Sequence, residues 1–276
     1  MVLLDGRLVS EVELSLPVPT HVVARADGGV WIAGAGTLLR VDRTGGVLAR
    51  VETSPIEGLA LLPDGAALTL EVEQGSRTLR RTEEAGRRWG RLELRPLALE
   101  ARWLVANGSR ALLGNDAELC LVTWDERAGG FAVLERRQGG GREGVASSGG
   151  EWLVLSSDGR ILERLSARLE PREANASTRP SLHVAATATA QWLAEPGSTW
   201  LRRIPLDGTR PTLHGVAHSS EIQSLLPFRN GLLVLLPGAV LLVGPDGEIE
   251  RAQGGFDGLV GGSVPPSSSA APMIGR

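Results

Sequence analysis

Two histidines at metal-binding spacing are the first residues in this chain whose types could do chemistry. His214 and His218, in LHGVAHSSE, lie four residues apart, which is the spacing of two ligands on one face of a helix. The surrounding pattern instead predicts a strand followed by a loop. Strand residues four apart are separated by about 13 Å at ~3.3 Å per residue, whereas each zinc ligand lies about 2.1 Å from its metal. The pair therefore predicts polar loop residues and no metal site, unless the loop folds back.

Nucleophiles and phosphate-binding loops give no stronger signal. Cys120, the only cysteine, lies in the apolar run LCLVTW, where a buried structural thiol is expected. Gly-x-Ser-x-Gly, P-loop and Cys-x-x-Cys patterns are absent from the sequence. The glycine-rich stretch QGGGREGVASSGG precedes no predicted helix, so it is not expected to cradle a phosphate. We therefore predict no catalytic residue, no metal ligand and no cofactor.

Charged residues form two groups that are candidates for contact with a protein partner, because Arg and Trp are enriched at interface hot spots. The first group is an arginine-rich segment with one tryptophan as anchor: Arg80, Arg81, Arg87, Arg88, Trp89 and Arg91. The second is mainly acidic and lies in loops expected at one face: Glu57, Asp116, Glu143, Asp158, Glu195, His218 and Glu221. The alternative is that these charges form an ordinary solvated surface.

The elements that must position these residues repeat along the chain. DGGVWIAGAGTLLRVDRTGG (27–46) predicts two strands between glycine turns, and a strand precedes and follows it. Dipeptides such as Asp-Gly, Asn-Gly and Gly-Gly are strong hairpin signals because their residues accept positive φ. They recur in phase about every 40 residues, which is the period of propeller blades.

This repeat predicts an all-β, seven-bladed β-propeller of four-stranded blades within a single domain, 1–276. The predicted blades are 18–56, 57–99, 100–141, 142–180, 181–219, 220–255, and a last one made from 256–276 plus 1–17. That last blade would close the ring with two strands from each end of the chain, which removes exposed sheet edges. Six blades are the alternative, and an open solenoid fits the ends less well.

The tryptophans divide by their predicted strand. Trp31, Trp152 and Trp192 occupy matching positions in the second strand of their blades, so we expect them in the core between blades. Trp124 and Trp200 fall, with Trp89, on outer or third strands, where they are freer to contact a partner.

Net charge and hydropathy exclude several classes of protein. The formal net charge of −3 over 276 residues argues against a general nucleic-acid binder. Pro237-Gly238 splits the longest apolar stretch, so no membrane span is expected. The start MVLLDGRLVSEVEL has no basic segment followed by a long apolar one, so a cytoplasmic location is expected. Every basic residue is Arg and Tyr is absent, which is typical of a GC-rich bacterial genome.

The unit DGGVWIAGAGTLLRVDRTGGVLARVE resembles the blade repeat of NHL-type, streptogramin-lyase-like and two-component-regulator propellers. Those repeats have a DG-x-[LV]-W-[IV] strand, a small glycine loop, a strand ending near R-[VI]-D and a turn glycine. GGEWLVLSSDGRILERL and AQWLAEPGSTWLRRIPLDG match in part. The resemblance implies an architecture and not an activity.

Two enzyme classes can be compared through the same resemblance. Streptogramin lyases use histidines and a glutamate with magnesium in their late blades, but residues 222–276 contain no histidine. Lactonases of the gluconolactonase type begin a blade with Glu-Gly-Pro, and Ile56-Glu57-Gly58-Leu59 lacks the proline.

We therefore predict a non-catalytic protein-interaction scaffold, a propeller subunit of a bacterial multiprotein assembly. The expected partners are proteins. From context rather than from a motif, we expect an ATPase or a von Willebrand A type protein of the same bacterial system. The alternative is a metal-dependent lyase or lactone hydrolase that acts at the loop face.

Overall fold

The computed structural model describes most of the chain. The described residues are 2–4, 7–10, 20–25, 27–34, 36–83, 85–147, 150–196, 199–216, 222–228, 231–236 and 239–254. Internal contacts divide the chain into two units, Met1–Arg179 and Pro180–Arg276. Each unit is built from antiparallel sheets whose strands follow one another in the sequence.

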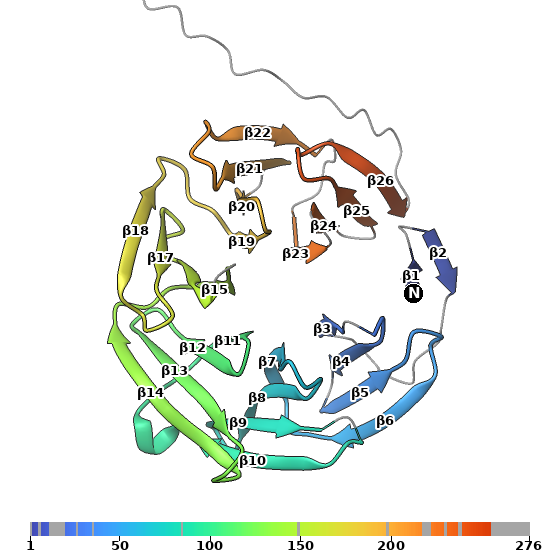
Figure 1. Cartoon of the computed structure of the whole chain (residues 1–276), viewed down its shortest axis with the longest axis vertical. Helices are drawn as coiled ribbons and strands as arrows, with labels where there is room; N and C mark the ends of the chain where they lie inside the picture. Colours follow the sequence, from blue (N-terminus) through green and yellow to red (C-terminus); the bar gives the residue numbers. More distant parts are fainter. Residues whose placement is uncertain are drawn as a thin grey trace, which may run out of the picture. The chain divides into compact units, whose positions relative to one another are not determined.

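The first unit contains a two-stranded sheet and four four-stranded sheets, which we number as blades (Figure 1). The two-stranded sheet pairs β1 (Val2–Leu4) with β2 (Arg7–Ser10). Blade 1 consists of β3 (His21–Ala24), β4 (Val30–Gly34), β5 (Thr37–Val41) and β6 (Val47–Glu52). Blade 2 consists of β7 (Ile56–Leu61), β8 (Ala67–Glu73), β9 (Ser76–Thr82) and β10 (Arg88–Glu93), and is followed by the 3-10 helix η1 (Arg95–Leu97).

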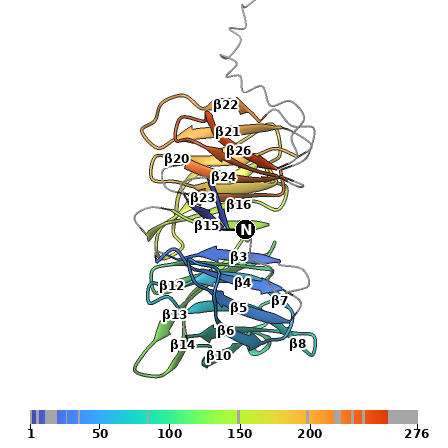
Figure 2. The same cartoon turned by 90° about the vertical axis from the view of Figure 1, so that its right-hand side faces the viewer.

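Blade 3 consists of β11 (Trp103–Asn107), β12 (Arg110–Gly114), β13 (Glu118–Asp125) and β14 (Gly130–Gln138). Blade 4 consists of β15 (Glu143–Ala146), β16 (Trp152–Leu155), β17 (Ile161–Leu165) and β18 (Pro171–Ala176). The first strands of neighbouring blades contact each other, β3 with β7, β7 with β11, and β11 with β15. The strands of a blade then follow in order, as β3 to β6 do in Figure 2.

The second unit contains two four-stranded sheets. Blade 5 consists of β19 (His183–Ala186), β20 (Ala190–Ala194), β21 (Trp200–Pro205) and β22 (Thr212–Gly215). Blade 6 consists of β23 (Ser224–Phe228), β24 (Gly231–Leu236), β25 (Ala239–Val243) and β26 (Ile249–Gly254). Their first strands, β19 and β23, contact each other as well.

Consecutive four-stranded antiparallel sheets of this kind are the blades of an all-β propeller. The described residues form six complete blades and not seven, so the six-blade alternative is the one supported. The two N-terminal strands do form a hairpin, but they stand as a sheet of two. The strands expected in 256–276, which were to complete a seventh blade with them, lie outside the described residues.

The hydrophobic core lies between adjacent blades. One cluster joins Trp31 and Leu38 of blade 1 to Leu59 of blade 2, and similar clusters join blades 2 and 3, 3 and 4, and 5 and 6. Trp31, Trp152 and Trp192 are at most 1% exposed, as their shared second-strand position predicted. The indole N–H of Trp31 donates to the carbonyl of Gly65 in the next blade at 3.0 Å. Burial and this hydrogen bond together fix the spacing of the two blades.

The outer strand of five blades contains a β-bulge. One extra residue interrupts the pairing with the preceding strand in blades 1, 2, 3, 4 and 6: Leu48, Gly90, Leu134, Arg172 and Glu250, respectively. In blades 1, 3, 4 and 6, four paired residues follow the bulge, so it occupies the same place in each. A bulge bends and twists the strand, which makes an exposed edge a poorer template for uncontrolled pairing.

No helix among the described residues is long and apolar enough to cross a membrane.

Candidate functional site: the charged face of blade 2

Alternating residues on three strands of blade 2 build a polar face toward blade 1. The strand register places Thr69 opposite Arg80, and Arg80 opposite Arg91. Since side chains two apart share a face, Glu71 and Glu73 join this face. The guanidinium of Arg88 also reaches the backbone oxygen of Glu52 in blade 1, at 3.4 Å.

The bulge at Gly90 is what brings two of the arginines together. Arg88 and Arg91 are three apart, so regular alternation would place them on opposite faces. The extra residue Gly90 reverses the alternation, and Arg88 and Arg91 pair with Thr82 and Arg80, which share one face. Gly90 has φ +60, and a Cβ there would lie 2.1 Å from the Trp124 ring of blade 3. Only glycine fits this position without a shift.

Glu71 is the buried centre of an ion-pair network. Its carboxylate is fully buried and accepts hydrogen bonds from Nη2 of Arg88 at 2.5 Å and from the hydroxyl of Thr69 at 2.7 Å. Nε of Arg80 lies 3.5 Å from the same carboxylate. A buried charge is tolerated only when it is paired and hydrogen-bonded, so these contacts are a condition for the packing of blades 1 and 2.

The network continues outward to solvent through Glu73. This carboxylate binds Arg80 Nη2 at 2.5 Å and Arg91 Nη2 at 2.8 Å. The hydrogen bond from Arg80 lowers the pKa of Glu73, so the carboxylate is ionised at neutral pH. Arg91 also lies 3.2 Å from Glu93, and its side chain is 45% exposed. Arg91 is therefore held in position while it remains accessible.

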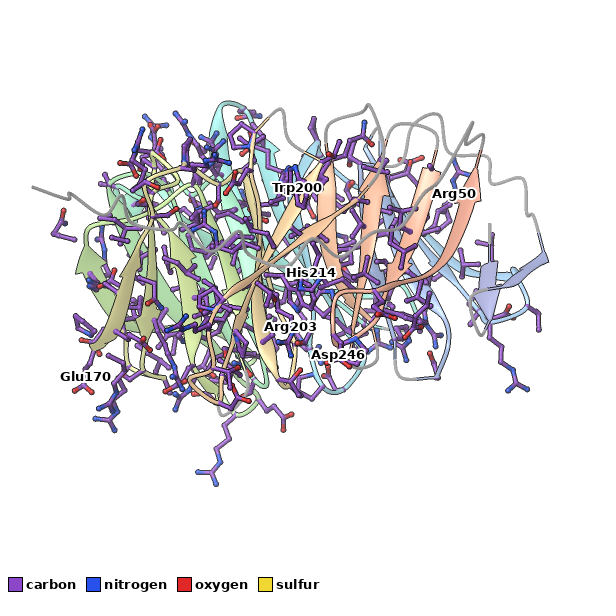
Figure 3. The ribbon with its side chains drawn as sticks, turned by 90° about the horizontal axis from the view of Figure 1, so that it is seen from above. Arg50, Glu170, Trp200, Arg203, His214 and Asp246 are labelled. Atoms are coloured by element: carbon purple, nitrogen blue, oxygen red, sulfur yellow. The ribbon has the colours of Figure 1, made fainter. Side chains whose placement is uncertain are left out.

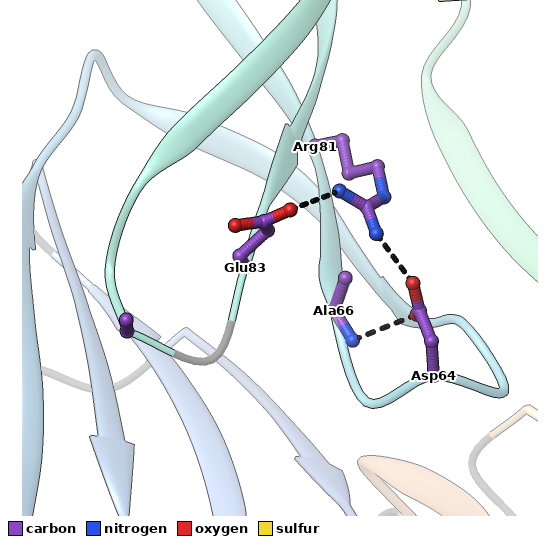
Figure 4. Close-up of a pocket in the computed structure, with 5 residues that line it drawn as sticks. Asp64, Ala66, Arg81 and Glu83 are labelled. Atoms are coloured by element: carbon purple, nitrogen blue, oxygen red, sulfur yellow. Dashed lines mark hydrogen bonds and ion pairs between the residues drawn. The ribbon is translucent and has the colours of Figure 1, made fainter. Parts of the chain in front are cut away.

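The opposite face of blade 2 holds another arginine in a cavity. Arg81 bonds to Asp64 and, at 3.2 Å, to Glu83 (Figure 4). Its guanidinium also lies 4.9 Å from the centroid of the Trp124 ring. Arg81, Asp64 and Glu83 line a cavity of about 320 Å³ together with two alanines, Ala66 and Ala85. Arg81 is nearly buried, which leaves little of it for a partner.

The remaining residues predicted in the arginine-rich segment are only partly described. Arg87 is exposed in the turn between β9 and β10. The Trp89 side chain lies outside what the structure describes. The segment is thus not a free cationic edge, because several of its arginines are neutralised by carboxylates of the same blade.

The acidic residues predicted to share a loop face have several different environments. Glu57 pairs with Arg77 at 2.7 Å, and exposed Asp116 lies 3.7 Å from Arg102. Glu195 is buried and bonds to a guanidinium at 2.7 Å, so it is not a surface contact.

Two further members of the acidic group differ again. Asp158 accepts a hydrogen bond from the hydroxyl of Ser156 at 2.5 Å, which lowers its pKa, and so it holds its own turn. Glu143 begins β15 and is half-buried. His218 and Glu221 lie outside the described residues.

His214 is packed in unit 2 rather than presented to a ligand. Its Nε2 hydrogen-bonds the hydroxyl of Thr212 at 2.7 Å, and its ring lies 6.0 Å from that of Trp192. Figure 3 shows it close to Arg203 and Asp246. Burial, and then the charge of Arg203, lower the pKa of His214. Among described residues, no group of three or more His, Cys, Asp or Glu could hold a metal ion.

Sequence reasoning identified the arginines but not their partners. Glu71 and Glu73 become the centre of the site only through strand register. The outer-strand leucines Leu48 and Leu134 were also missed. The signal for them was present, because Val47-Leu48 and Val133-Leu134 place two apolar residues side by side and break the alternation of a strand.

No protein-family model matches the chain, and no curated protein matches it in sequence. Solved structures share its fold. A functionally unknown protein from Desulfotomaculum acetoxidans has a TM-score of 0.69 at 12% identity, covering 87% of this chain and 86% of that one. A catalytically inactive virginiamycin B lyase from Staphylococcus aureus, crystallised with quinupristin, has a TM-score of 0.66 at 16% identity, covering 85% and 83%.

BamB from Moraxella catarrhalis is similar to this chain too, with a TM-score of 0.60 at 14% identity and coverage of 89% and 75%. These likenesses confirm the predicted streptogramin-lyase-like propeller architecture. At such identities they show the fold alone.

Proposed function

We propose that the protein is a non-catalytic interaction scaffold whose partner docks at the exposed end of the charged face of blade 2, at Arg91 and Glu93. The observation that supports this most is the position of Arg91, which two carboxylates orient while nearly half of its side chain remains in solvent. A side chain ordered before binding loses less entropy when a partner binds. Arginine is also among the residues that contribute most at interfaces.

The proposed partner is a protein of the same bacterial system, an ATPase or a von Willebrand A type protein being the first candidates. A carboxylate on the partner would find Arg91 already oriented, and a basic group would find Glu93, which is 54% exposed. Such paired charges favour specificity and fast association over tight binding.

The test is capture of the partner with variants that change only the exposed end of the network. Arg91→Glu places a negative charge beside Glu73 and Glu93 without touching the buried carboxylate of Glu71. The partner that wild-type protein captures from its source is identified by mass spectrometry, purified and titrated calorimetrically. We expect Arg91→Glu to bind it at least about tenfold more weakly.

Arg102→Glu is the matched control, because its side chain is 66% exposed and makes only a 3.7 Å contact in blade 3. It should bind like wild type. Equal binding by Arg91→Glu would remove this face from the proposal, and failure of wild type to capture any stoichiometric partner would remove the scaffold function.

A metal-dependent lyase or lactone hydrolase is the second candidate. It is favoured only by the fold shared with virginiamycin B lyase. Native mass spectrometry with magnesium or calcium, with and without chelator, tests it. A divalent ion retained by the folded chain would support an enzyme, and no retention would oppose it.

A further inference from the structure

Two apolar pairs are exposed at equivalent outer-strand bulges of unit 1. Val47 and Leu48 of β6 are 52% and 53% exposed, and Val133 and Leu134 of β14 are 39% and 46% exposed. In each pair the leucine is the extra residue of the bulge. The free energy of the system falls when adjacent apolar side chains leave water, so exposed pairs of this kind are typical of contact surfaces.

Opposite charges accompany the two pairs. Arg50 lies two residues beyond Leu48, is exposed and is labelled in Figure 3. Glu135 directly follows Leu134 and is exposed. Within the described residues, neither side chain makes a hydrogen bond or ion pair. We call Val47, Leu48 and Arg50 the basic rim patch, and Val133, Leu134 and Glu135 the acidic rim patch.

Nearby charges do not cancel this difference. Arg136, next to Glu135, is already paired with Glu118 at 2.6 Å, and Arg137 with Glu163 at 2.6 Å. Glu52 is exposed at the far end of β6, four residues beyond Leu48. The acidic rim patch therefore keeps one uncompensated negative charge, and the basic rim patch keeps a positive charge nearest its leucine.

We infer that the basic rim patch of one molecule binds the acidic rim patch of a second copy of this chain. The two patches carry the same apolar pair, Val-Leu, and opposite free charges, so each complements the other and neither complements itself. A contact between unlike patches is heterologous: each new molecule presents a fresh patch, and the assembly grows into a chain or closes into a ring.

The association is expected to be weak and dependent on concentration and salt. We expect a contact between two such small patches to bury less than the roughly 800 Å² per partner of a stable interface, and an exposed ion pair is screened by salt. Sedimentation velocity over a range of protein concentrations should show the average sedimentation coefficient rising with concentration at low salt and less so at high salt.

Charge reversal gives the decisive test. Arg50→Glu makes both patches acidic, and Glu135→Arg makes both basic, so each variant alone should lose self-association, by about tenfold or more in affinity. In an equimolar mixture, each acidic patch of Arg50→Glu can meet a basic patch of Glu135→Arg, so unlike patches again carry opposite charges. The mixture should therefore associate again, which no misfolded or merely destabilised variant would do.

Matched controls reverse exposed charges elsewhere. Arg210→Glu and Glu100→Arg change the net charge by the same amounts and should associate like wild type. Wild-type protein that stays monomeric at every concentration would overturn the inference. So would single reversals that still associate, or a mixture that does not recover.

Discussion

Removal of Arg88 is the most direct test of the ion-pair network, because Arg88 holds the buried carboxylate of Glu71. Breaking a fully buried pair costs about 3–5 kcal/mol through the charge left behind. Here the loss is smaller, since Arg80 stays 3.5 Å away and Thr69 still donates at 2.7 Å. We therefore expect Arg88→Ala to lower the free energy of unfolding by about 2–3 kcal/mol.

The assay is urea unfolding followed by tryptophan fluorescence, with Arg91→Ala as the matched variant. Arg91 makes an exposed pair, which is worth about 0–1 kcal/mol. In thermal unfolding, the Arg88→Ala loss corresponds to a fall in Tm of roughly 4–10 °C. Near-equal losses in the two variants would refute the assignment of Glu71 as a buried charge that depends on Arg88.

A second substitution, Glu71→Gln, should change the free energy of unfolding in opposite directions in two backgrounds. In the wild-type background, Glu71→Gln removes the partner of Arg88 and should destabilise the fold. In the Arg88→Ala background it removes a buried charge that has lost its strongest partner, and should restore about 1 kcal/mol or more of unfolding free energy. The same sign in both backgrounds would contradict the reasoning.

Three more predictions concern single sites. Gly90→Ala should lower the free energy of unfolding by about 2 kcal/mol or more, since positive φ and the Trp124 ring both oppose a Cβ. Gly129→Ala is the control, because Gly129 has a similar φ but open space around it. In the same urea unfolding assay the control should cost about 1 kcal/mol. Burial raises the pKa of Cys120 to about 11, so the folded protein should not react with a thiol reagent at pH 8, and rapid labelling would contradict this. The pKa of His214 is lowered in the fold, so the stability gained by keeping this imidazole neutral is present above pH 6.5 and is lost as the pH falls below it. His214→Phe should flatten that decline of the unfolding free energy with falling pH. An unchanged slope would contradict this prediction.

The blade architecture could be predicted from sequence because it rests on local signals. Turn dipeptides predict the hairpins, and the matching positions of Trp31 and Trp152 in the repeat identify the buried second strand of their blades. The number of blades was harder, since the count used hairpin turns and the N-terminal hairpin β1–β2 stands as a sheet of two. A hairpin is local, whereas the predicted seventh blade required pairing between strands from opposite ends of the chain.

The candidate site was predictable in its residue types but not in its pairing. Arg88 and Arg91 share a face only because of the bulge at Gly90, and no period-two rule anticipates that. Glu195 looked like a loop acid, yet it is buried against Arg202. Which charge meets which depends on cross-strand register, and one slipped residue changes every partner.

The recurrent outer-strand bulge has a consequence for how this surface can change. The inserted residue has no cross-strand partner, so pairing does not dictate its type, and only in blade 2 does a packed ring restrict it, since Trp124 leaves no room for a side chain at Gly90. In blades 1, 3, 4 and 6 the inserted residue is Leu, Leu, Arg and Glu, respectively. These four blades thus each have one position at the outer strand where mutation can alter surface chemistry at little structural risk. New contacts can evolve, or be engineered, blade by blade.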